Sequence, residues 1–247
     1  MNYDKINGQH FLSMVSNASL RLEEEKAYVD SLNVFPVPDG DTGTNMSMTF
    51  TAAVKSIEDS KSESIGEISK MMARGALMGA RGNSGVILSQ IFRGIAKGFE
   101  NKEDVNPHEF TLALLEGSKA AYRAVMRPTE GTILTVIREV GEQSTKIHTD
   151  DFEEIFNSIC EIGKITLDNT PELLPPLKKA NVVDSGGMGL LIILEGMRDA
   201  LLNDFKVTKK LTHSVSEDYV AARDTHQEIT FGFCTEFMIY AEPNNQK

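Results

Sequence analysis

The stretch LSQIFRGIAKGF, residues 88–99, shows the pattern that decides the fold of this chain. Its apolar residues recur at steps of three and four positions, at Leu88, Ile91, Phe92, Ile95 and Phe99. This spacing places them on one face of an α-helix, because the helix repeats every 3.6 residues. The stretch is therefore predicted to be an amphipathic helix that buries one face.

The same spacing recurs on both sides of this stretch. Together with a shorter segment at 68–77, it predicts roughly eight helices between residues 8 and 206, built on the apolar positions of 11–32, 46–57, 68–77, 88–99, 110–125, 133–140, 152–159 and 190–205. No alternation typical of strands interrupts this region, so the α/β sheet of a P-loop or Rossmann fold is not expected. The sequence predicts an all-α fold, packed as a bundle or barrel.

The C-terminal tail has a different pattern. Residues 207–227 are polar and resemble a linker, whereas apolar residues alternate between 229 and 239, at Ile229, Phe231, Phe233, Phe237 and Ile239. Alternation predicts a β-strand, and a single strand does not fold alone. We therefore expect a helical domain over 1–208, and a linker with the first strand of an incomplete second domain over 209–247.

Composition excludes several functional classes. The 247 residues carry a formal net charge of −11, which disfavours binding to nucleic acid or to an anionic membrane surface. The longest apolar run, 190–194, is far too short to span a bilayer, so no stable membrane insertion is expected. The two cysteines, Cys160 and Cys234, do not form a metal or disulfide pattern, and the N-terminus lacks a signal pattern. These features predict a cytoplasmic protein.

Two aspartates stand in NVFPVPDGDTGTNM, residues 33–46. Asp39 and Asp41 lie two positions apart on a loop before a helix, and crowded carboxylates of this kind suit a hard cation such as Mg²⁺. The alternative is a helix cap within an ordinary turn. A calcium loop of the EF-hand type is excluded, because its fifth, sixth and twelfth positions would be Gly43, Thr44 and Phe50.

Further glycine-rich segments precede helices. In MGARGNSG, residues 78–85, the glycines allow close approach of a ligand, and the following helix start offers free N–H groups that suit phosphate. The alternative is a turn capped by Asn83 or Ser84. The segment lacks the Gly-Lys-Ser/Thr ending of a P-loop.

The third segment, NVVDSGGMG at 181–189, contains Asp184 and Ser185, either of which could cap the next helix. A weaker fourth segment, RPTEGT at 127–132, contains Glu130, which we interpret as a first-turn helix acid. If these loops gather at one end of a bundle, they form a cup for a polyphosphate, with two aspartates to hold its metal.

These segments resemble a known family. VFPVPDGDTGTNM, residues 34–46, resembles the signature of the ATP-binding domain of bacterial fatty acid kinase, which is related to the nucleotide-binding L subunit of dihydroxyacetone kinase. The segments 79–85, 130–132 and 184–187 resemble the other nucleotide-binding elements of the family, in the same order. The resemblance covers about residues 1–206, and the tail around 231–237 resembles the opening of the middle domain of the longer fatty acid kinase.

The resemblance implies an antiparallel eight-helix barrel with nucleotide at one end. It implies that two Mg²⁺ ions are held by Asp39 and Asp41. The dihydroxyacetone kinase subunit has a further aspartate slightly upstream of this pair. Near that position this sequence has Asn33, which can offer a carbonyl oxygen to the metal. The ATP contacts that it implies are Thr42, Thr44, Asn45, Met46, Gly82, Asn83, Ser84, Gly85, Gly131, Thr132, Asp184, Ser185, Gly186 and Gly187.

The function implied by the resemblance is transfer of the γ-phosphoryl group of Mg-ATP to a fatty acid carboxylate. A separate fatty-acid-binding protein would present that acid, and homodimers occur in the family. Two alternatives stay open at this point. One is the nucleotide-binding subunit of a dihydroxyacetone kinase, and the other is a regulatory module that binds ATP without turnover.

Overall fold

A computed structural model of the chain describes residues 3–206 and confirms the all-α prediction. Eight helices of 12 or more residues lie in this range: α1 (Gly8–Ser31), α2 (Thr42–Lys55), α3 (Ile65–Met78), α4 (Gly82–Gly98), α5 (Pro107–Ala124), α6 (Ile133–Ser144), α7 (Phe152–Asp168) and α10 (Ser185–Leu202). The strand predicted at 229–239 and the domain boundary near 208 lie outside the described residues.

Four short elements were not predicted. Two are helices, α8 (Thr170–Leu173) and α9 (Pro175–Ala180), and two are strands of two residues each, β1 (Ile6–Asn7) and β2 (Asp104–Val105). The strands pair antiparallel, with Ile6 opposite Val105. Elements this short contain less than two helical turns or one alternation, so the sequence shows no period from which to predict them.

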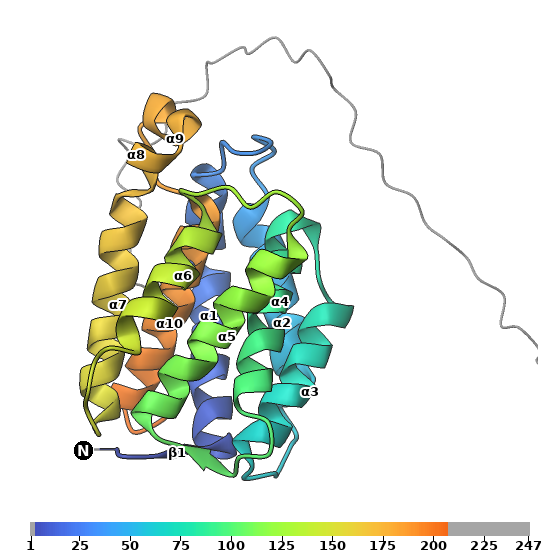
Figure 1. Cartoon of the computed structure of the whole chain (residues 1–247). Coiled ribbons are helices and arrows are strands. Elements are labelled where there is room, and N and C mark those ends of the chain that lie inside the picture. Colours follow the sequence, from blue (N-terminus) through green and yellow to red (C-terminus); the bar gives the residue numbers. More distant parts are fainter. Residues whose placement is uncertain (1–2, 207–247) are drawn as a thin grey trace, which may run out of the picture.

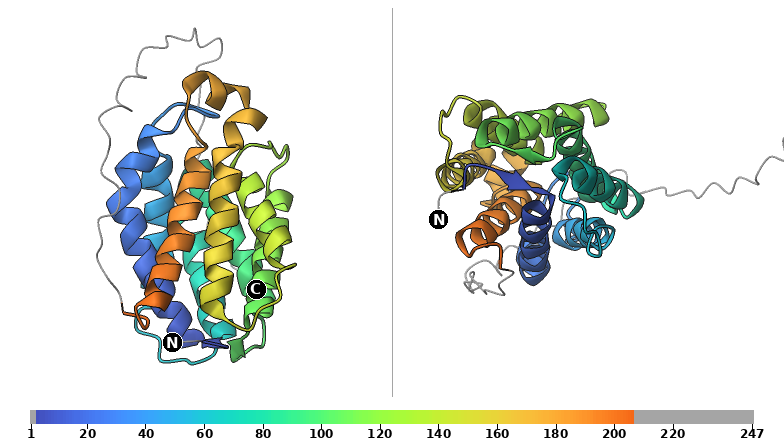
Figure 2. Two further views of the ribbon diagram at one scale, coloured as in Figure 1. Left: turned by 90° about the vertical axis from the view of Figure 1, so that its left-hand side faces the viewer. Right: turned by 90° about the horizontal axis from the view of Figure 1, so that it is seen from below.

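The long helices alternate in direction along the bundle (Figure 1). Each long helix contacts the next one in sequence, and α10 returns to contact α1, which closes the arrangement (Figure 2). Because the directions alternate, α2, α4, α6 and α10 all begin at the same end of the bundle, where α8 and α9 also lie. The small β1–β2 sheet lies at the opposite end. Among residues 3–206, no helix has the length and apolar character needed to cross a membrane.

The contact between α1 and α10 is close. A Cβ atom on Gly196 would stand 2.6 Å from the Cα atom of Ala18, so only glycine allows this approach. Beside it, the buried Asn17 side chain donates a hydrogen bond to the Gly196 carbonyl at 2.7 Å. The first and last long helices among the described residues, α1 and α10, therefore pack with their backbones close together.

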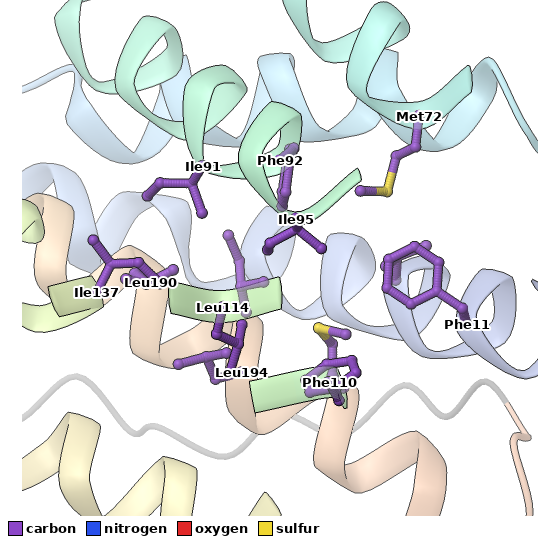
Figure 3. Close-up of a pocket in the computed structure, with 13 residues that line it drawn as sticks. Phe11, Met72, Ile91, Phe92, Ile95, Phe110, Leu114, Ile137, Leu190 and Leu194 are labelled. Carbon is purple, nitrogen blue, oxygen red and sulfur yellow. The ribbon is translucent and has the colours of Figure 1, made fainter. Parts of the chain in front are cut away.

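The interior of the bundle is apolar. It contains a cavity of about 20 Å³, lined by 13 residues from several helices, among them Phe11, Phe92, Leu114, Ile137 and Leu194 (Figure 3). No polar side chain is among these 13 residues, so the space offers a water molecule none of the hydrogen-bonding partners that it needs. A charged polyphosphate has no place there, so a site for one must lie outside this apolar interior.

A second, smaller core lies at the end where α8 and α9 pack. It consists of Leu32, Leu174, Leu177 and Val182, and the half-buried Val34 and Phe35 pack against it. This core joins the loop that follows α1 to the α8–α9 segment. The apolar first part of the 33–46 motif therefore anchors the loop, and its acidic second part is left at the surface.

Candidate functional site

Three of the motif segments meet at Thr42, the first residue of α2. The Ser84 hydroxyl at the start of α4 donates to the Thr42 carbonyl oxygen at 3.3 Å. The Ser185 hydroxyl at the start of α10 donates to the Thr42 hydroxyl oxygen at 3.2 Å. The starts of α2, α4 and α10, which lie far apart in sequence, therefore gather at one end of the bundle.

Asp39 and Asp41 lie exposed on the loop that leads into this point. Partial burial raises the pKa of the Asp39 carboxyl, and the charge of Asp41 and a hydrogen bond between the two side chains raise it further. Asp41 immediately precedes α2, but its side chain makes no capping hydrogen bond. The capping role considered as an alternative for Asp41 is therefore absent. The two carboxyl groups interact with each other, and a bound cation would relieve the repulsion between their charges.

The paired aspartates form only part of a metal coordination shell. Within residues 3–206, no group of three or more histidine, cysteine, aspartate or glutamate side chains is placed to hold a metal ion. A hard cation between Asp39 and Asp41 would need further oxygen atoms from hydroxyl groups, backbone carbonyls, water or a bound phosphate. That requirement suits an ion that arrives with a nucleotide.

Asn33 is buried beneath the aspartate loop. Its side-chain oxygen accepts a hydrogen bond from the Gly40 N–H at 2.9 Å, and Gly40 has a left-handed φ of +67°. The Asn33 side-chain oxygen thus stabilises the turn between Asp39 and Asp41 by accepting this hydrogen bond. Its ligation of a metal stays a prediction.

The start of α4 approaches α2 through glycines. Gly82 has a φ of +57°, and a Cβ atom there would stand 2.4 Å from the Asn45 side-chain nitrogen. A Cβ atom on Gly85 would stand 2.2 Å from the Thr49 hydroxyl oxygen. Arg81 precedes the helix without a side-chain cap, so the alternative in which Asn83 or Ser84 caps it is not what the structure has. The first N–H groups of α4 therefore lack a side-chain cap, as a site for an anion needs.

Replacement of Gly82 by alanine is expected to lower the free energy of unfolding by about 1–3 kcal/mol, because the left-handed backbone is unfavourable for alanine and the new methyl group meets Asn45. Chemical denaturation checks this value. Gly98→Ala is not a suitable control, since a Cβ atom there also collides, whereas Glu100→Ala changes an exposed residue and should leave stability within about 0.5 kcal/mol. Equal stability of Gly82→Ala and the wild type would contradict the prediction.

Asp184 joins the starts of two helices. Its carboxylate accepts from the Gly187 N–H at 2.8 Å, which caps α10, and it also bonds the backbone of Ile133 at the start of α6. The side chain is 4% exposed. Burial raises the pKa of this carboxyl to about 6, although the two backbone hydrogen bonds act in the opposite direction. The cap considered from sequence for Asp184 is thus present.

Ser185, Gly186 and Gly187 are buried with Asp184. A Cβ atom on Gly187 would stand 2.9 Å from a Leu167 methyl carbon, which explains one of the glycines by helix packing. Met46 is 0% exposed and packs against Gly189, so it belongs to the core and is not open to a ligand in this structure. In this structure these predicted nucleotide contacts are therefore buried, and their contact with a nucleotide stays a prediction.

The loop before α6 is held by Glu130. Its carboxylate accepts from the Tyr122 hydroxyl at 2.9 Å, the Thr135 hydroxyl at 2.7 Å and the Arg138 guanidinium at 3.1 Å. These bonds lower the pKa of the Glu130 carboxyl against the effect of burial, which is the largest single influence and raises it. Glu130 precedes α6 and does not lie in its first turn, so that interpretation from sequence is wrong.

The adjoining residues fix the same loop to its neighbours. Thr132 caps α6, accepting from the Leu134 N–H at 3.3 Å. Gly131 has a φ of +81° and is packed against Leu173 and Leu174. The loop that contains the predicted contacts Gly131 and Thr132 therefore lies against the α8–α9 segment at the same end of the bundle.

Sequence reasoning missed Asp30, in the last turn of α1. Both of its carboxylate oxygens bind Thr44: one accepts from the Thr44 N–H at 3.0 Å and the other from the Thr44 hydroxyl at 2.7 Å. A signal was available, because an acid in the last turn of a helix opposes the helix dipole and is unfavourable without a local partner. Its partner lies 14 residues away, and only the tertiary structure shows it.

The fold and site define a class of protein: an all-α, antiparallel helical domain with glycine-rich helix starts and an aspartate pair at one end. Comparison with known families assigns the chain to one of them. Residues 36–199 match the DAK2 domain, and this chain belongs to that family. The match begins within the aspartate loop and ends in α10, so it includes residues 36–46 of the first motif segment and the other three segments in full.

Several relatives are similar over nearly the whole chain. Protein YloV of Bacillus subtilis is 41% identical over an alignment of 249 positions, gaps included. The alignment covers 97% of this chain and 45% of that protein. An uncharacterised protein of Staphylococcus saprophyticus is 43% identical over 243 residues, covering 95% of this chain and 44% of that protein. The chain thus spans less than half the length of these curated relatives.

One solved structure has a similar fold. The dihydroxyacetone kinase from C. freundii, in complex with AMP-PNP and Mg²⁺, superposes with a TM-score of 0.56 at 15% sequence identity. The superposition covers 76% of this chain and 33% of that one. At this level of identity, the similarity establishes the shared helical fold.

Proposed function

We propose that this domain binds Mg-ATP and acts as the nucleotide-handling part of a kinase that phosphorylates a fatty acid carboxylate. The observation that carries the proposal is the meeting of the α2, α4 and α10 starts at Thr42, beside the exposed pair Asp39 and Asp41. Helix starts offer N–H groups and positive dipole ends to phosphate, while paired carboxylates attract its metal ions. The DAK2 family and the AMP-PNP and Mg²⁺ complex of the similar kinase support this proposal.

The residues that would hold magnesium are Asp39 and Asp41, with two ions proposed. Bound magnesium would neutralise charge on the phosphates and make the γ-phosphorus more electrophilic. The uncapped N–H groups at the start of α4 would bind phosphate oxygens. Gly82 and Gly85 let this helix lie against Asn45 and Thr49, which brings those N–H groups close to the aspartate loop.

The chemical step needs no base from the protein. A carboxylate oxygen of the acid forms a bond to the γ-phosphorus, the bond from that phosphorus to the bridging β–γ oxygen breaks, and ADP leaves with the electron pair. The products are an acyl phosphate and ADP. Positioning and charge neutralisation supply the catalysis in such a transfer.

The acid would be presented by a separate lipid-binding protein. The cavity inside the bundle has a volume of about 20 Å³, which is too small for an acyl chain. The exposed aspartate loop leaves the nucleotide end open to a partner. The fatty acid as substrate rests on the resemblance of the 34–46 signature to the fatty acid kinase domain.

Dihydroxyacetone is the second candidate acceptor. The fold shared with the C. freundii kinase favours it, because that protein is named for this substrate. In that case a substrate-binding subunit would replace the lipid-binding protein, and the nucleotide end would serve the same purpose. A regulatory domain that binds ATP without turnover is the remaining outcome of the experiments below.

The first experiment is calorimetric titration of ATP with and without Mg²⁺. We expect binding by the wild type that requires magnesium, and its loss in Asp39→Ala plus Asp41→Ala, because the ion loses both carboxylates. The matched control is Glu58→Ala plus Asp59→Ala, which removes two exposed acids after α2, at the other end of the bundle. No binding by the wild type, or loss in the control as well, would contradict the proposed site.

The second experiment identifies the acceptor. The protein is incubated with Mg-ATP and a candidate lipid-binding partner loaded with palmitate, and acyl phosphate is trapped with hydroxylamine. We expect ADP and acyl hydroxamate in equal amounts, and neither without the partner. ADP release with dihydroxyacetone and its binding subunit would favour the second candidate. Tight ATP binding with no turnover under either condition would favour the regulatory domain.

A further inference from the structure

The contact between Asp30 and Thr44 fixes the direction of one hydroxyl group. Asp30 lies at the end of α1 and Thr44 in the first turn of α2, three residues after Asp41. One Asp30 oxygen accepts from the Thr44 N–H at 3.0 Å, and the other accepts from the Thr44 hydroxyl at 2.7 Å. Both lengths lie within the usual range for hydrogen bonds, so the Asp30 carboxylate binds both the backbone and the side chain of Thr44.

The chemical consequence lies in what the hydroxyl has left to offer. A hydroxyl has one proton to donate and two lone pairs that accept, whereas a carboxylate can only accept. Because the Thr44 proton is directed to Asp30, the Thr44 oxygen has only its lone pairs left for any further partner. Such an oxygen suits a cation or one of its water ligands, and it cannot donate to a phosphate oxygen.

We propose that Asp30 is a positioning residue that turns the Thr44 hydroxyl so that its oxygen serves the divalent cation held by Asp39 and Asp41. This inference rests on the proposed function and deepens it: Thr44 acts toward the metal and not toward the phosphate. The Thr44 oxygen would also be one of the further ligands that a cation between Asp39 and Asp41 needs. Among residues 3–206, no group of three or more histidine, cysteine, aspartate or glutamate side chains is placed to hold a metal ion. Phosphate is then bound by backbone N–H groups.

The test reverses the hydrogen bond without changing its shape. In Asp30→Asn, the amide oxygen can still accept from the Thr44 N–H, but the amide nitrogen donates to the Thr44 oxygen and uses a lone pair. Mn²⁺ is titrated into the protein with saturating ADP, and free Mn²⁺ is followed by electron paramagnetic resonance. We expect Asp30→Asn to weaken Mn²⁺ binding at least tenfold, while ADP affinity without divalent cation stays within twofold of the wild type.

A double-mutant cycle separates positioning from a direct effect. Thr44→Val removes the oxygen and should also weaken Mn²⁺ binding, and Asp30→Asn added to it should have no further effect, since Asp30 acts through Thr44. The matched control is Glu23→Gln: Glu23 binds the Ser47 hydroxyl between the same two helices, in the next turn of α2. Its Mn²⁺ affinity should stay within twofold. Thermal melting of each variant without ligand verifies the fold.

Each outcome bears on the inference. Wild-type affinity for Mn²⁺ in Asp30→Asn, or a further loss when it is combined with Thr44→Val, would overturn the positioning role while leaving the proposed function intact. Absence of Mn²⁺ and ADP binding in the wild type would overturn the proposed function, and the inference with it. Loss of binding in Glu23→Gln as well would show that any weakened α1–α2 contact has this effect, which also overturns the inference.

Discussion

Replacement of Arg21 by methionine is expected to lower the free energy of unfolding by about 3–5 kcal/mol. The Arg21 guanidinium binds three carboxylates at the contact between α1 and α10: Glu25 at 3.1 Å, Glu195 at 2.6 Å and Asp199 at 2.8 Å. The Arg21 side chain is 10% exposed and that of Glu25 is 7% exposed. Methionine preserves much of the packing volume but leaves three neighbouring carboxylates without this cation, in a setting that water screens poorly.

Chemical denaturation at neutral pH measures this loss. The matched control is Lys5→Met, which breaks the ion pair with Asp104 at 2.9 Å, where the two side chains are 58% and 43% exposed. Water screens that pair, so its loss should cost less than about 1 kcal/mol. A loss below about 1 kcal/mol for Arg21→Met would show that the α1–α10 contact does not depend on this cation.

Replacement of Asp184 by alanine is expected to lower the free energy of unfolding by about 2 kcal/mol. The change leaves the buried N–H groups of Gly187 and Ile133 without their acceptor, at about 1–3 kcal/mol each, and relief of a buried charge offsets part of the cost. Asp184→Asn keeps an acceptor oxygen and removes the charge. Its stability at pH 7 should therefore equal or exceed that of the wild type.

The pH dependence has a definite sign. The pKa of the Asp184 carboxyl is about 6 in the folded protein and 3.8 in its ordinary state, so the folded protein binds this proton more tightly than the unfolded chain. Its stabilising effect is present below pH 4 and is lost as the pH rises to 6, on the order of 3 kcal/mol in all. The stability of Asp184→Asn relative to the wild type should therefore increase between pH 4 and pH 7. A constant difference would show that burial does not raise this pKa.

Much of the fold could be predicted because its signal is local. In residues 88–99 the apolar side chains share one face through the geometry of the helix alone, and the structure has α4 there. The same holds for the other seven long helices among residues 3–206. The α8 and α9 helices could not be predicted in this way, because four and six residues are too few to show a period.

The candidate site divides in the same way. Asp39 and Asp41 are two residues apart on one loop, so the spacing in the sequence was enough to predict that their carboxyl groups interact. The glycines at 82 and 85 were visible as unusual, but the side chains that require them, Asn45 and Thr49, belong to another helix. Met46 stands within the motif, yet its side chain faces the core because it lies on the inner face of α2.

The sequence by itself determined the helical class, the positions of the long helices and the acidic loop, since each depends on neighbours within a few residues. Only the tertiary structure decided three sets of hydrogen bonds. Asp30 binds Thr44, Glu130 fixes the loop before α6, and Asp184 binds the starts of both α10 and α6. Antiparallel packing is the physical reason. It brings the starts of alternate helices to one end, so that Thr42 and Ser185, 143 positions apart, share a hydrogen bond.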